Sequence, residues 1–289
     1  MGGRGKALVT GATRGIGRQT ALVLAEVGYD VAITGRTQRE GDGVIAARAT
    51  GGDDGVHAVP GSLASTAAEI EARGTQALPV VMDLADEQGV IAAVDAVHAA
   101  WGKVDVLVNN GFVHLPQQRL FEIDRASADA VWDGNFYHQV LLTRMVVARM
   151  LEGDGGLVAN MVSGSATTDP RGLPGDGGWG LLYAASKAAF GRLAGIVNAE
   201  FAEAGVRAFN IDPGFVVTES GRARGGSEAI EEKGFASADP AASGQVIAWL
   251  AAHPEDGARE WLGRTIWAPK LAGALAAATD RVPQAEGVE

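Results

Sequence analysis

The chain has 289 residues, a net charge of −11 at pH 7 and no cysteine. Its length suits one large α/β core, and the absence of cysteine excludes disulfides, cysteine nucleophiles and thiolate metal sites. The negative charge, without a Lys/Arg cluster, disfavours nucleic acid and anionic membranes as partners. No apolar run approaches the ~18 residues of a membrane span, and the five histidines show no metal-ligand spacing with carboxylates. We therefore expect a soluble cytoplasmic protein that binds no metal and has no signal peptide.

The first expected strand, residues 6–10, runs into the segment TGATRGIG at positions 10–17 and then into a helical pattern. Its three glycines, Gly11, Gly15 and Gly17, would let the backbone turn tightly and come close to a pyrophosphate. The free amides at the start of the helix would attract the phosphate charge. An ordinary glycine turn would look the same, so the motif needs support from the rest of the chain.

The end of the second expected strand, residues 30–34, bears on the choice between the two nicotinamide cofactors. An acid there accepts the ribose hydroxyls, whereas a base meets the extra phosphate of NADP. The chain reads Thr34-Gly35-Arg36, with no carboxylate. Arg36 offers a planar fork suited to the 2'-phosphate, with Arg14 as a second cation. This pattern favours NADP(H) over NAD(H), although both arginines could simply face solvent.

Strands and helices continue to alternate along the chain. Further strands are expected at residues 77–82, 104–108, 156–161, 206–211 and 264–267. The alternation predicts an α/β fold, a Rossmann-type doubly wound parallel sheet of about seven strands with helices on both faces, in a single domain of residues 1–289. Stretches rich in Gly, Pro or charge are expected to be loop insertions, namely residues 40–61, 164–180 and 219–234. The polar tail from about residue 280 could be disordered.

Tyr183 and Lys187 stand four residues apart in the run Tyr-Ala-Ala-Ser-Lys, which reads as a helix. At that spacing both side chains share one face. A neighbouring cation favours phenolate, so it can bring the phenol pKa from ~10 toward the range of acid-base catalysis. A half-buried aromatic and a solvated amine would give the same pattern. The glycine motif, as a cofactor site, favours the catalytic interpretation.

Together, the glycine motif and the Tyr-Lys pair resemble the short-chain dehydrogenase/reductase family over residues 6–267. Four further matches support the resemblance: the strand and Asn109-Asn110-Gly111 turn, Asn135 in a helix, Ser163 after an apolar stretch, and Asp212-Pro213-Gly214 followed by Thr218. The long second crossover looks most like the branch of the family that includes dehydrogenase/reductase member 1.

The resemblance implies catalytic roles for four residues. Tyr183 would exchange a proton with the substrate oxygen as hydride passes to or from the nicotinamide, and Lys187 would lower the Tyr183 pKa and bind the nicotinamide ribose. Ser163 would hold the carbonyl oxygen, and Asn135 would position a water that relays protons toward Lys187. The alternative for Ser163 is a hydroxyl that caps a turn. The alternative for Asn135 is a buried amide bonded to helix backbone.

The resemblance also implies a set of cofactor-binding residues. They are Gly11, Thr13, Arg14, Gly15, Ile16, Gly17, Arg36, Asp83, Asn109, Gly111, Lys187, Pro213, Gly214 and Thr218. Asp83 would contact adenine or, alternatively, cap the following helix. The chain departs from the family pattern at Phe112, where a small residue is usual. It departs again in the long gap between Ser163 and Tyr183, which is expected to form a flap containing Trp179.

The expected function is that of an NADP(H)-dependent oxidoreductase acting on a small-molecule carbonyl or secondary alcohol. A largely apolar pocket is expected between Phe112, His114, Trp179, Phe215 and residues 219–234. Two alternatives are a non-catalytic NADP(H)-binding regulatory protein, which the intact Ser163, Tyr183 and Lys187 disfavour, and a sugar-nucleotide epimerase, which usually has a larger C-terminal region. Surplus apolar residues on the helices around residues 141–150 and 183–201, with the family's habit, predict a homodimer or homotetramer.

Overall fold

The computed structural model describes residues 4–46, 55–174, 176–224, 236–254 and 259–279. Seven strands form one sheet in the order β5-β2-β1-β6-β7-β8-β9, and every neighbouring pair is parallel. These strands are β1 (Gly5–Val9), β2 (Tyr29–Gly35), β5 (Ala77–Val81), β6 (Val106–Asn109), β7 (Gly156–Met161), β8 (Val206–Asp212) and β9 (Thr265–Trp267). All seven strands lie where the sequence places them, and the Rossmann-type doubly wound sheet is confirmed.

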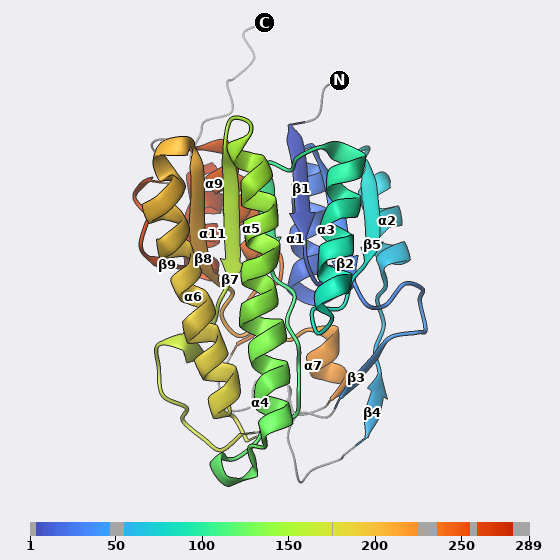
Figure 1. Cartoon of the computed structure of the whole chain (residues 1–289), viewed down its shortest axis with the longest axis vertical. Coiled ribbons are helices and arrows are strands. Elements are labelled where there is room, and N and C mark those ends of the chain that lie inside the picture. The colour runs from blue at the N-terminus through green and yellow to red at the C-terminus, as the bar shows by residue number, and fades with distance from the viewer. Residues whose placement is uncertain (1–3, 47–54, 175, 225–235, 255–258, 280–289) are drawn as a thin grey trace, which may run out of the picture.

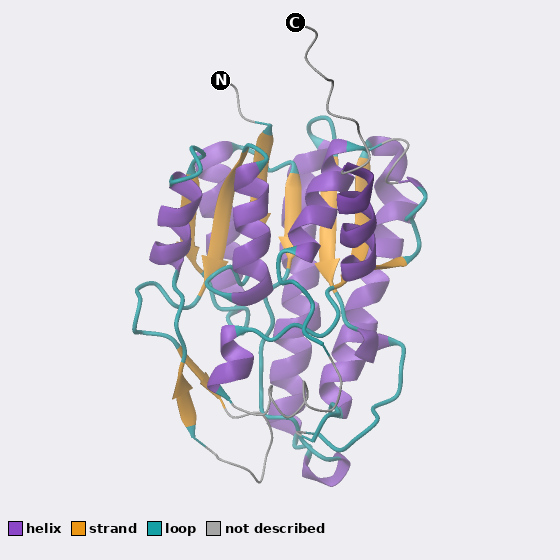
Figure 2. Cartoon of the chain, turned by 180° about the vertical axis from the view of Figure 1, so that it is seen from behind, coloured by secondary structure: helices purple, strands orange, loops and turns teal. Residues whose placement is uncertain are grey.

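Helices cover both faces of the sheet (Figures 1 and 2). One layer contains α1 (Gly15–Glu26), α2 (Leu63–Glu71), α9 (Ala242–Ala252) and α11 (Ala268–Thr279). The opposite layer contains α3 (Glu87–Trp101), α5 (His138–Leu151) and α6 (Leu181–Phe201), with α4 (Arg125–Trp132) extending α5 beyond the sheet. Among the described residues, no helix combines the length and apolar character needed to cross a membrane.

The two helix layers explain why the strands are apolar throughout. Successive side chains of a strand point to opposite faces of the sheet. In β1, Ala7 and Val9 therefore pack in the core beneath α1 and α9, whereas Leu8 packs in the core beneath α3 and α5. Leu107 and Val108 of β6 divide in the same way. A parallel sheet buried on both faces leaves its strand ends as the place for polar chemistry.

All parallel strands of the sheet end at one edge, the lower edge in Figure 1. The short helix α7 (Glu219–Ala223) lies below this edge, as does a separate hairpin of β3 (Val44–Ala46) and β4 (Val56–Ala58). In open α/β sheets, ligands bind at the carboxyl edge where the strand order reverses. Here that point lies between β1 and β6, so the glycine turn and the Asn-Gly turn meet there.

The structure corrects part of the expected loop insertions. Residues 40–61 were expected to be a loop, but they contain the antiparallel β3–β4 hairpin, in which Ile45 pairs with His57. Its strands are only three residues long, too short to show a strand period among the surrounding glycines and charges. The described residues of 164–180 contain the 3-10 turn η3 (Gly164–Ala166) and an isolated bridge between Pro174 and Gly178.

Other organisational predictions are only partly covered by the structure. Residues 219–224 contain α7, and residues 225–234 lie outside the described part. The tail from residue 280, predicted to be disordered, also lies outside it. One sheet carries all seven main strands, as a single domain would, and the domain assignment stays a prediction.

Candidate active site

The glycine turn leaves the start of α1 open to an anion. Gly11 and Gly15 have φ angles of 66° and 58°, a left-handed conformation that favours glycine. A Cβ on Gly17 would collide with the Asn110 side chain and the Gly11 carbonyl. The amides of Gly15, Ile16 and Gly17 form the first turn of α1, where backbone amides lack helix partners and attract negative charge.

Thr10 and Asn110 tie the glycine turn to the turn after β6. Thr10 Oγ1 accepts hydrogen bonds from the amides of Asn110 (3.0 Å) and Gly111 (2.8 Å). Asn110 Nδ2 donates to the carbonyls of Thr10 (2.9 Å) and Gly11 (3.2 Å). Neither Thr10 nor the Asn110 side chain was expected to take part in the site. The only sequence feature that could have indicated them is that each is a polar residue directly after a buried strand.

Gly111 fits a confined space at this junction. A Cβ there would collide with Leu84. Gln139 of α5, also missed by the sequence analysis, donates from Nε2 to the Gly111 carbonyl at 2.7 Å. The turn therefore holds Gly111 on both its amide and its carbonyl, and the chain then continues into Phe112.

The structure brings Tyr183, Lys187 and Ser163 together at the end of β7. Lys187 is 8% exposed, and its Nζ donates to the Met161 carbonyl at 2.7 Å. The side chains of Ser163 and Ser165 lie near the Tyr183 phenol and favour its charged form. Ser163 Oγ also accepts from the Ser165 amide at 3.2 Å, so it caps η3 while facing the phenol. Both interpretations of Ser163 are therefore compatible with its position.

Burial shifts the pKa values of Tyr183 and Lys187 in opposite directions. Burial raises the pKa of the Tyr183 phenol, the side chains of Ser163 and Ser165 lower it, and the Asp212 carboxylate raises it, with a net increase. The expected lowering of the Tyr183 pKa by Lys187 stays a prediction. Burial lowers the pKa of Lys187 to about 8, with Asp212 opposing. Both shifts have the same cause, because burial disfavours the charged form of either group.

Asn135 lies in a π-helical turn, η2 (Asp133–Tyr137), between α4 and α5. Its Oδ1 accepts from the Val113 amide at 2.7 Å, and its Nδ2 donates to the Val113 carbonyl at 2.9 Å. Asn135 thus pins the loop after β6 to the helix. The alternative of a buried amide bonded to backbone is therefore compatible with its position, and the backbone that it bonds belongs to the loop after β6. Its role as a water-positioning residue stays a prediction.

Arg36 and Asp83 lie close together at the ends of β2 and β5. Arg36 Nη1 is 3.9 Å from Asp83 Oδ2, and their side chains are 63% and 41% exposed. Asp83 Oδ1 accepts from the Ala85 amide at 3.0 Å. The alternative that Asp83 caps the following helix is wrong, because α3 begins after Asp86, whose Oδ1 accepts from the Gln88 amide.

Arg14 binds groups of the protein itself. Its Nε donates to the Pro60 carbonyl at 2.8 Å, and its Nη2 donates to the Gly61 carbonyl at 2.7 Å and to Thr37 Oγ1 at 3.0 Å. Burial lowers the pKa of the Arg14 guanidinium; Glu219 and Glu40 oppose this effect, and nearby Arg36 adds to it. Arg14 therefore holds the end of the insertion against the glycine turn, and Arg36 is left as the exposed cation at the end of β2.

The other predicted cofactor residues differ in their access to the crevice. Asn109 is 1% exposed, and its Nδ2 donates to Thr143 Oγ1 (2.8 Å) and Asn160 Oδ1 (3.0 Å), so its side chain joins β6 to β7 and α5. Thr13 is buried against Gly35. Thr218 caps α7 and contacts Gly15. The Pro213-Gly214 turn follows β8, where the Gly214 amide donates to Asp212 Oδ1 at 2.9 Å.

Glu219 is an unexpected participant at the glycine turn. Its Oε2 accepts from the Gly15 amide at 2.9 Å. Beyond the other end of α7, Arg224 Nη1 lies 2.8 Å from Nε2 of His114, in the loop after β6. Helix α7 thus bridges the glycine turn and that loop. The sequence carries no local signal for a contact between residues 204 positions apart.

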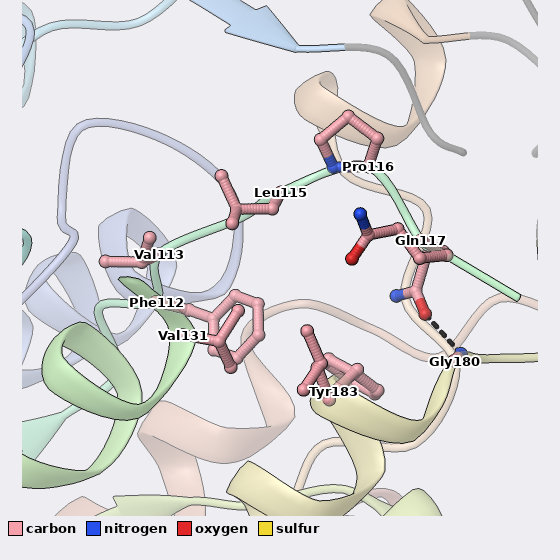
Figure 3. A pocket seen from close by; sticks show the side chains of 10 residues that line it. Phe112, Val113, Leu115, Pro116, Gln117, Val131, Gly180 and Tyr183 are labelled. Carbon is pink, nitrogen blue, oxygen red and sulfur yellow. Dashed lines mark hydrogen bonds between the residues drawn. The ribbon is translucent and has the colours of Figure 1, made fainter. Parts of the chain in front are cut away.

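A small hollow, open to solvent, lies beside Tyr183 (Figure 3). Its apolar lining includes Phe112, Val113, Leu115, Val131 and Leu182. Gln117 closes one side by accepting a hydrogen bond from the Gly180 amide. Of the residues expected to line the pocket, Phe112 does so, whereas His114, Trp179 and Phe215 do not line this hollow. The start of α6 packs against the loop after β6, so the hollow lies between Tyr183 and that loop.

The short chain dehydrogenase family model matches residues 5–63 and 56–228. The chain belongs to the short-chain dehydrogenase/reductase family. D-threitol dehydrogenase of Mycolicibacterium smegmatis is 35% identical over 219 residues, which cover 74% of this chain and 71% of the relative. Short chain dehydrogenase mpl6 of Monascus purpureus is 32% identical over 73% of this chain, and the match spans 64% of the length of that relative. The predicted branch of dehydrogenase/reductase member 1 stays a prediction.

Solved structures show the same fold. A 3-oxoacyl-[acyl-carrier protein] reductase from Brucella melitensis has a TM-score of 0.71 and 25% identity, covering 93% of this chain and 97% of its own. A short chain dehydrogenase from Burkholderia cenocepacia J2315 in complex with NADP has a TM-score of 0.72 and 25% identity, covering 92% and 97%. One from Mycobacterium paratuberculosis bound to NAD has a TM-score of 0.72 and 23% identity, covering 92% and 96%. Both nicotinamide cofactors thus occur among these neighbours.

The lowered pKa of Lys187 predicts how stability depends on pH. The folded protein releases this proton near pH 8, whereas the unfolded chain keeps it to about pH 10.5. Between these values the unfolded state binds more protons, so the contribution of Lys187 to the free energy of unfolding rises with pH. We expect wild type to gain stability relative to Lys187→Met from pH 8 to pH 10.5 in urea unfolding. A difference that stays flat or falls over this range would contradict the assignment.

Proposed function

We propose that the protein is an NADP(H)-dependent oxidoreductase that transfers hydride between the nicotinamide and a carbonyl or secondary alcohol substrate. The observation that supports this most directly is the Tyr183 phenol, which lies near the Ser163 side chain and at the wall of a hollow lined mainly by apolar residues. The amides at the start of α1 lie at the same edge of the sheet and suit a dinucleotide pyrophosphate once Glu219 releases the Gly15 amide. An acid-base group, an anion site and an apolar pocket are the parts that this reaction requires.

The bound dinucleotide supplies the hydride, and the side chains of this chain manage the proton and the oxygen. Tyr183 donates its proton to the carbonyl oxygen during reduction, while Ser163 holds that oxygen by a hydrogen bond. The raised pKa of Tyr183 keeps the phenol protonated at neutral pH, which suits proton donation. Lys187, held by the Met161 carbonyl, binds the nicotinamide ribose and places a cation near the phenolate that forms.

Replacing Tyr183 tests this assignment. Tyr183→Phe keeps the ring but removes the reacting hydroxyl, so we expect turnover to fall by roughly 10²- to 10⁴-fold while NADPH affinity changes less than about twofold. The measurements are steady-state kinetics with NADPH on a panel of ketones and aldehydes, and fluorescence titration of NADPH. Lys187→Ala serves as a comparison that should impair both binding and turnover. Near-wild-type rates for Tyr183→Phe would refute the proposal.

The preference for NADP(H) rests on Arg36. Its exposed guanidinium follows the end of β2, and Gly35 provides no competing acid. Arg36 Nη1 lies 3.9 Å from Asp83 Oδ2, so these two side chains must move apart before a phosphate can bind between them. A bidentate contact to the 2'-phosphate is worth ~1.5 to 3 kcal/mol, roughly ten- to a hundredfold in affinity. Arg36 therefore carries the preference without the help of Arg14.

We expect Arg36→Ala to weaken NADPH binding by roughly ten- to a hundredfold and NADH binding by less than about threefold. Calorimetric titration of both reduced cofactors measures the two affinities. Arg39→Ala is a matched control, because Arg39 follows the same strand but is exposed farther along the chain. Equal losses for the two cofactors in Arg36→Ala would show that Arg36 does not read the 2'-phosphate.

Glu219 must leave the Gly15 amide when a pyrophosphate takes that position. Its carboxylate accepts the same kind of backbone hydrogen bond that a phosphate oxygen would accept, and its charge repels the phosphate. We expect Glu219→Gln to bind NADPH several-fold more tightly than wild type in calorimetric titration. Glu203→Gln removes an equal charge from an exposed site in the 3-10 turn η4 (Ala202–Ala204) and should leave affinity unchanged. Weaker binding by Glu219→Gln would mean that Glu219 supports the bound state.

A homodimer or homotetramer stays part of the proposal. Val146, Met150 and Val197 are buried within the protomer, whereas many other apolar residues of α5 and α6 are half-buried or exposed. Ile196 remains 55% exposed on α6, beside the small exposed residues Gly195 and Ala199. Small residues around an apolar side chain allow close approach of a symmetry-related helix.

We expect light scattering of the wild type at micromolar concentration to give a mass of two or four protomers of 29.6 kDa. Ile196→Glu places a charge at the proposed contact and should shift the mass toward one protomer. Glu200→Gln, an exposed change on the same helix, is the control. A wild type that scatters as a monomer would refute the proposed assembly.

A further inference from the structure

Phe112 contacts both groups of the Tyr-Lys pair. Its ring lies edge-on to the ring of Tyr183, with centroids 5.3 Å apart and an interplanar angle of 78°. Lys187 Nζ lies 4.8 Å from the centroid of the same ring, within the range of a cation–π contact. The Phe112 side chain also lines the hollow beside Tyr183 (Figure 3). One aromatic ring therefore separates the reacting phenol and its ammonium neighbour from part of the pocket.

The backbone on both sides of Phe112 is fixed. Before it, the Gly111 carbonyl accepts from Gln139 Nε2 at 2.7 Å, and the Gly111 amide donates to Thr10 Oγ1 at 2.8 Å. After it, Val113 is held at its amide and its carbonyl by the Asn135 side chain. These four hydrogen bonds come from buried or half-buried groups, so they set the position from which the ring projects. The Phe112 ring is a firm wall rather than a mobile flap.

We propose that Phe112 is a specificity-determining residue, whose ring sets the size and shape of the substrate group that can lie beside Tyr183. This inference rests on the proposed function. A carbonyl oxygen that reaches the Tyr183 phenol brings its carbon substituents against the Phe112 ring. One substituent then enters the hollow lined by Val113, Leu115 and Leu182.

The chemistry of this wall defines the substrate class. The hollow offers apolar surface, and a charged substituent there would lose its hydration without a described ionic partner among the lining residues. We infer that the preferred substrate is a ketone or secondary alcohol with one apolar substituent of limited bulk. Of the two glutamines in the lining, Gln117 Oε1 accepts from the Gly180 amide and Gln118 Nε2 donates to the Glu122 carbonyl, so both are engaged with the protein and apolar side chains make up most of the remaining lining. The Phe112 ring fills space that a substituted aromatic group would otherwise occupy.

A graded series of ketones tests the inference. The substrates are methyl ketones with straight alkyl chains of increasing length, acetophenone, and acetophenones with bulky para substituents, each assayed for kcat/KM with saturating NADPH. Phe112→Ala should raise the ratio of kcat/KM for bulky over small ketones by roughly tenfold or more, because each methylene in an apolar pocket changes discrimination by about ten- to 200-fold. Phe112→Leu, with intermediate volume, should give an intermediate ratio.

Phe121→Ala is the matched control. It makes the same substitution at a fully exposed phenylalanine of the 3-10 turn η1 (Leu120–Glu122), and the ratio should stay within twofold of wild type. NADPH titration of each variant shows whether the cofactor site is intact. If Phe112→Ala fails to fold, the comparison of Phe112→Leu with wild type carries the test.

The outcomes separate the two proposals. Variants at Phe112 that change kcat/KM by the same factor for every ketone would overturn the role in specificity and leave the oxidoreductase proposal standing. A wild type that binds NADPH but turns over no ketone, aldehyde or alcohol would refute the proposed function and this inference with it. A wild type that prefers small charged substrates would refute the apolar substrate class alone.

Discussion

The hydrogen bonds between Thr10 and the Asn110-Gly111 turn join the ends of β1 and β6, and the arrangement of the rest of the site depends on this contact. A parallel sheet covered on both faces offers polar chemistry only at its strand ends. At the switch point two neighbouring strands continue into turns that lead in opposite directions. Because Thr10 accepts from both amides of the second turn, the glycine turn and Phe112 keep a fixed relation. The anion site and the wall of the hollow therefore move as one unit.

Burial governs the electrostatics of the Tyr-Lys pair. The protein places a phenol and an ammonium in a region of low polarity, where the neutral form of each is favoured. The Met161 carbonyl and the face of the Phe112 ring partly offset the cost of burying the ammonium of Lys187. The Ser163 side chain has the same effect on the charged form of the Tyr183 phenol. Asp212 acts on both groups in the same direction, toward the protonated form. Burial and Asp212, rather than an interaction between Tyr183 and Lys187, therefore keep the phenol protonated and ready to donate its proton.

Acidic and basic side chains surround the cofactor crevice unevenly. Glu219 faces the amides of α1, Arg14 is committed to the insertion that follows β2, and Arg36 remains at the rim. Helix α7 contacts the glycine turn through Glu219 and the loop after β6 through Arg224 and His114. These two contacts join loops that follow different strands at the carboxyl edge of the sheet.

The sequence by itself determined the seven strands, the glycine turn and the positions of Tyr183 and Lys187. These features depend on periodicities and spacings within about 20 residues, where local geometry leaves few choices. Ser163 was singled out by the family resemblance, because it follows an apolar stretch where the family has its catalytic serine. The β3–β4 hairpin escaped detection because three-residue strands are too short to show a period.

Only the tertiary structure decided how the remaining side chains are used. Arg14 binds carbonyls 46 and 47 residues away, and Asn135 binds a loop 22 residues away. Glu219 reaches Gly15 across 204 positions, and burial raises the pKa of Tyr183. Each of these outcomes depends on which elements pack together and how much water they exclude. Local sequence patterns reveal neither the packing partners nor the degree of burial, because both are set only when distant segments pack together in the folded protein.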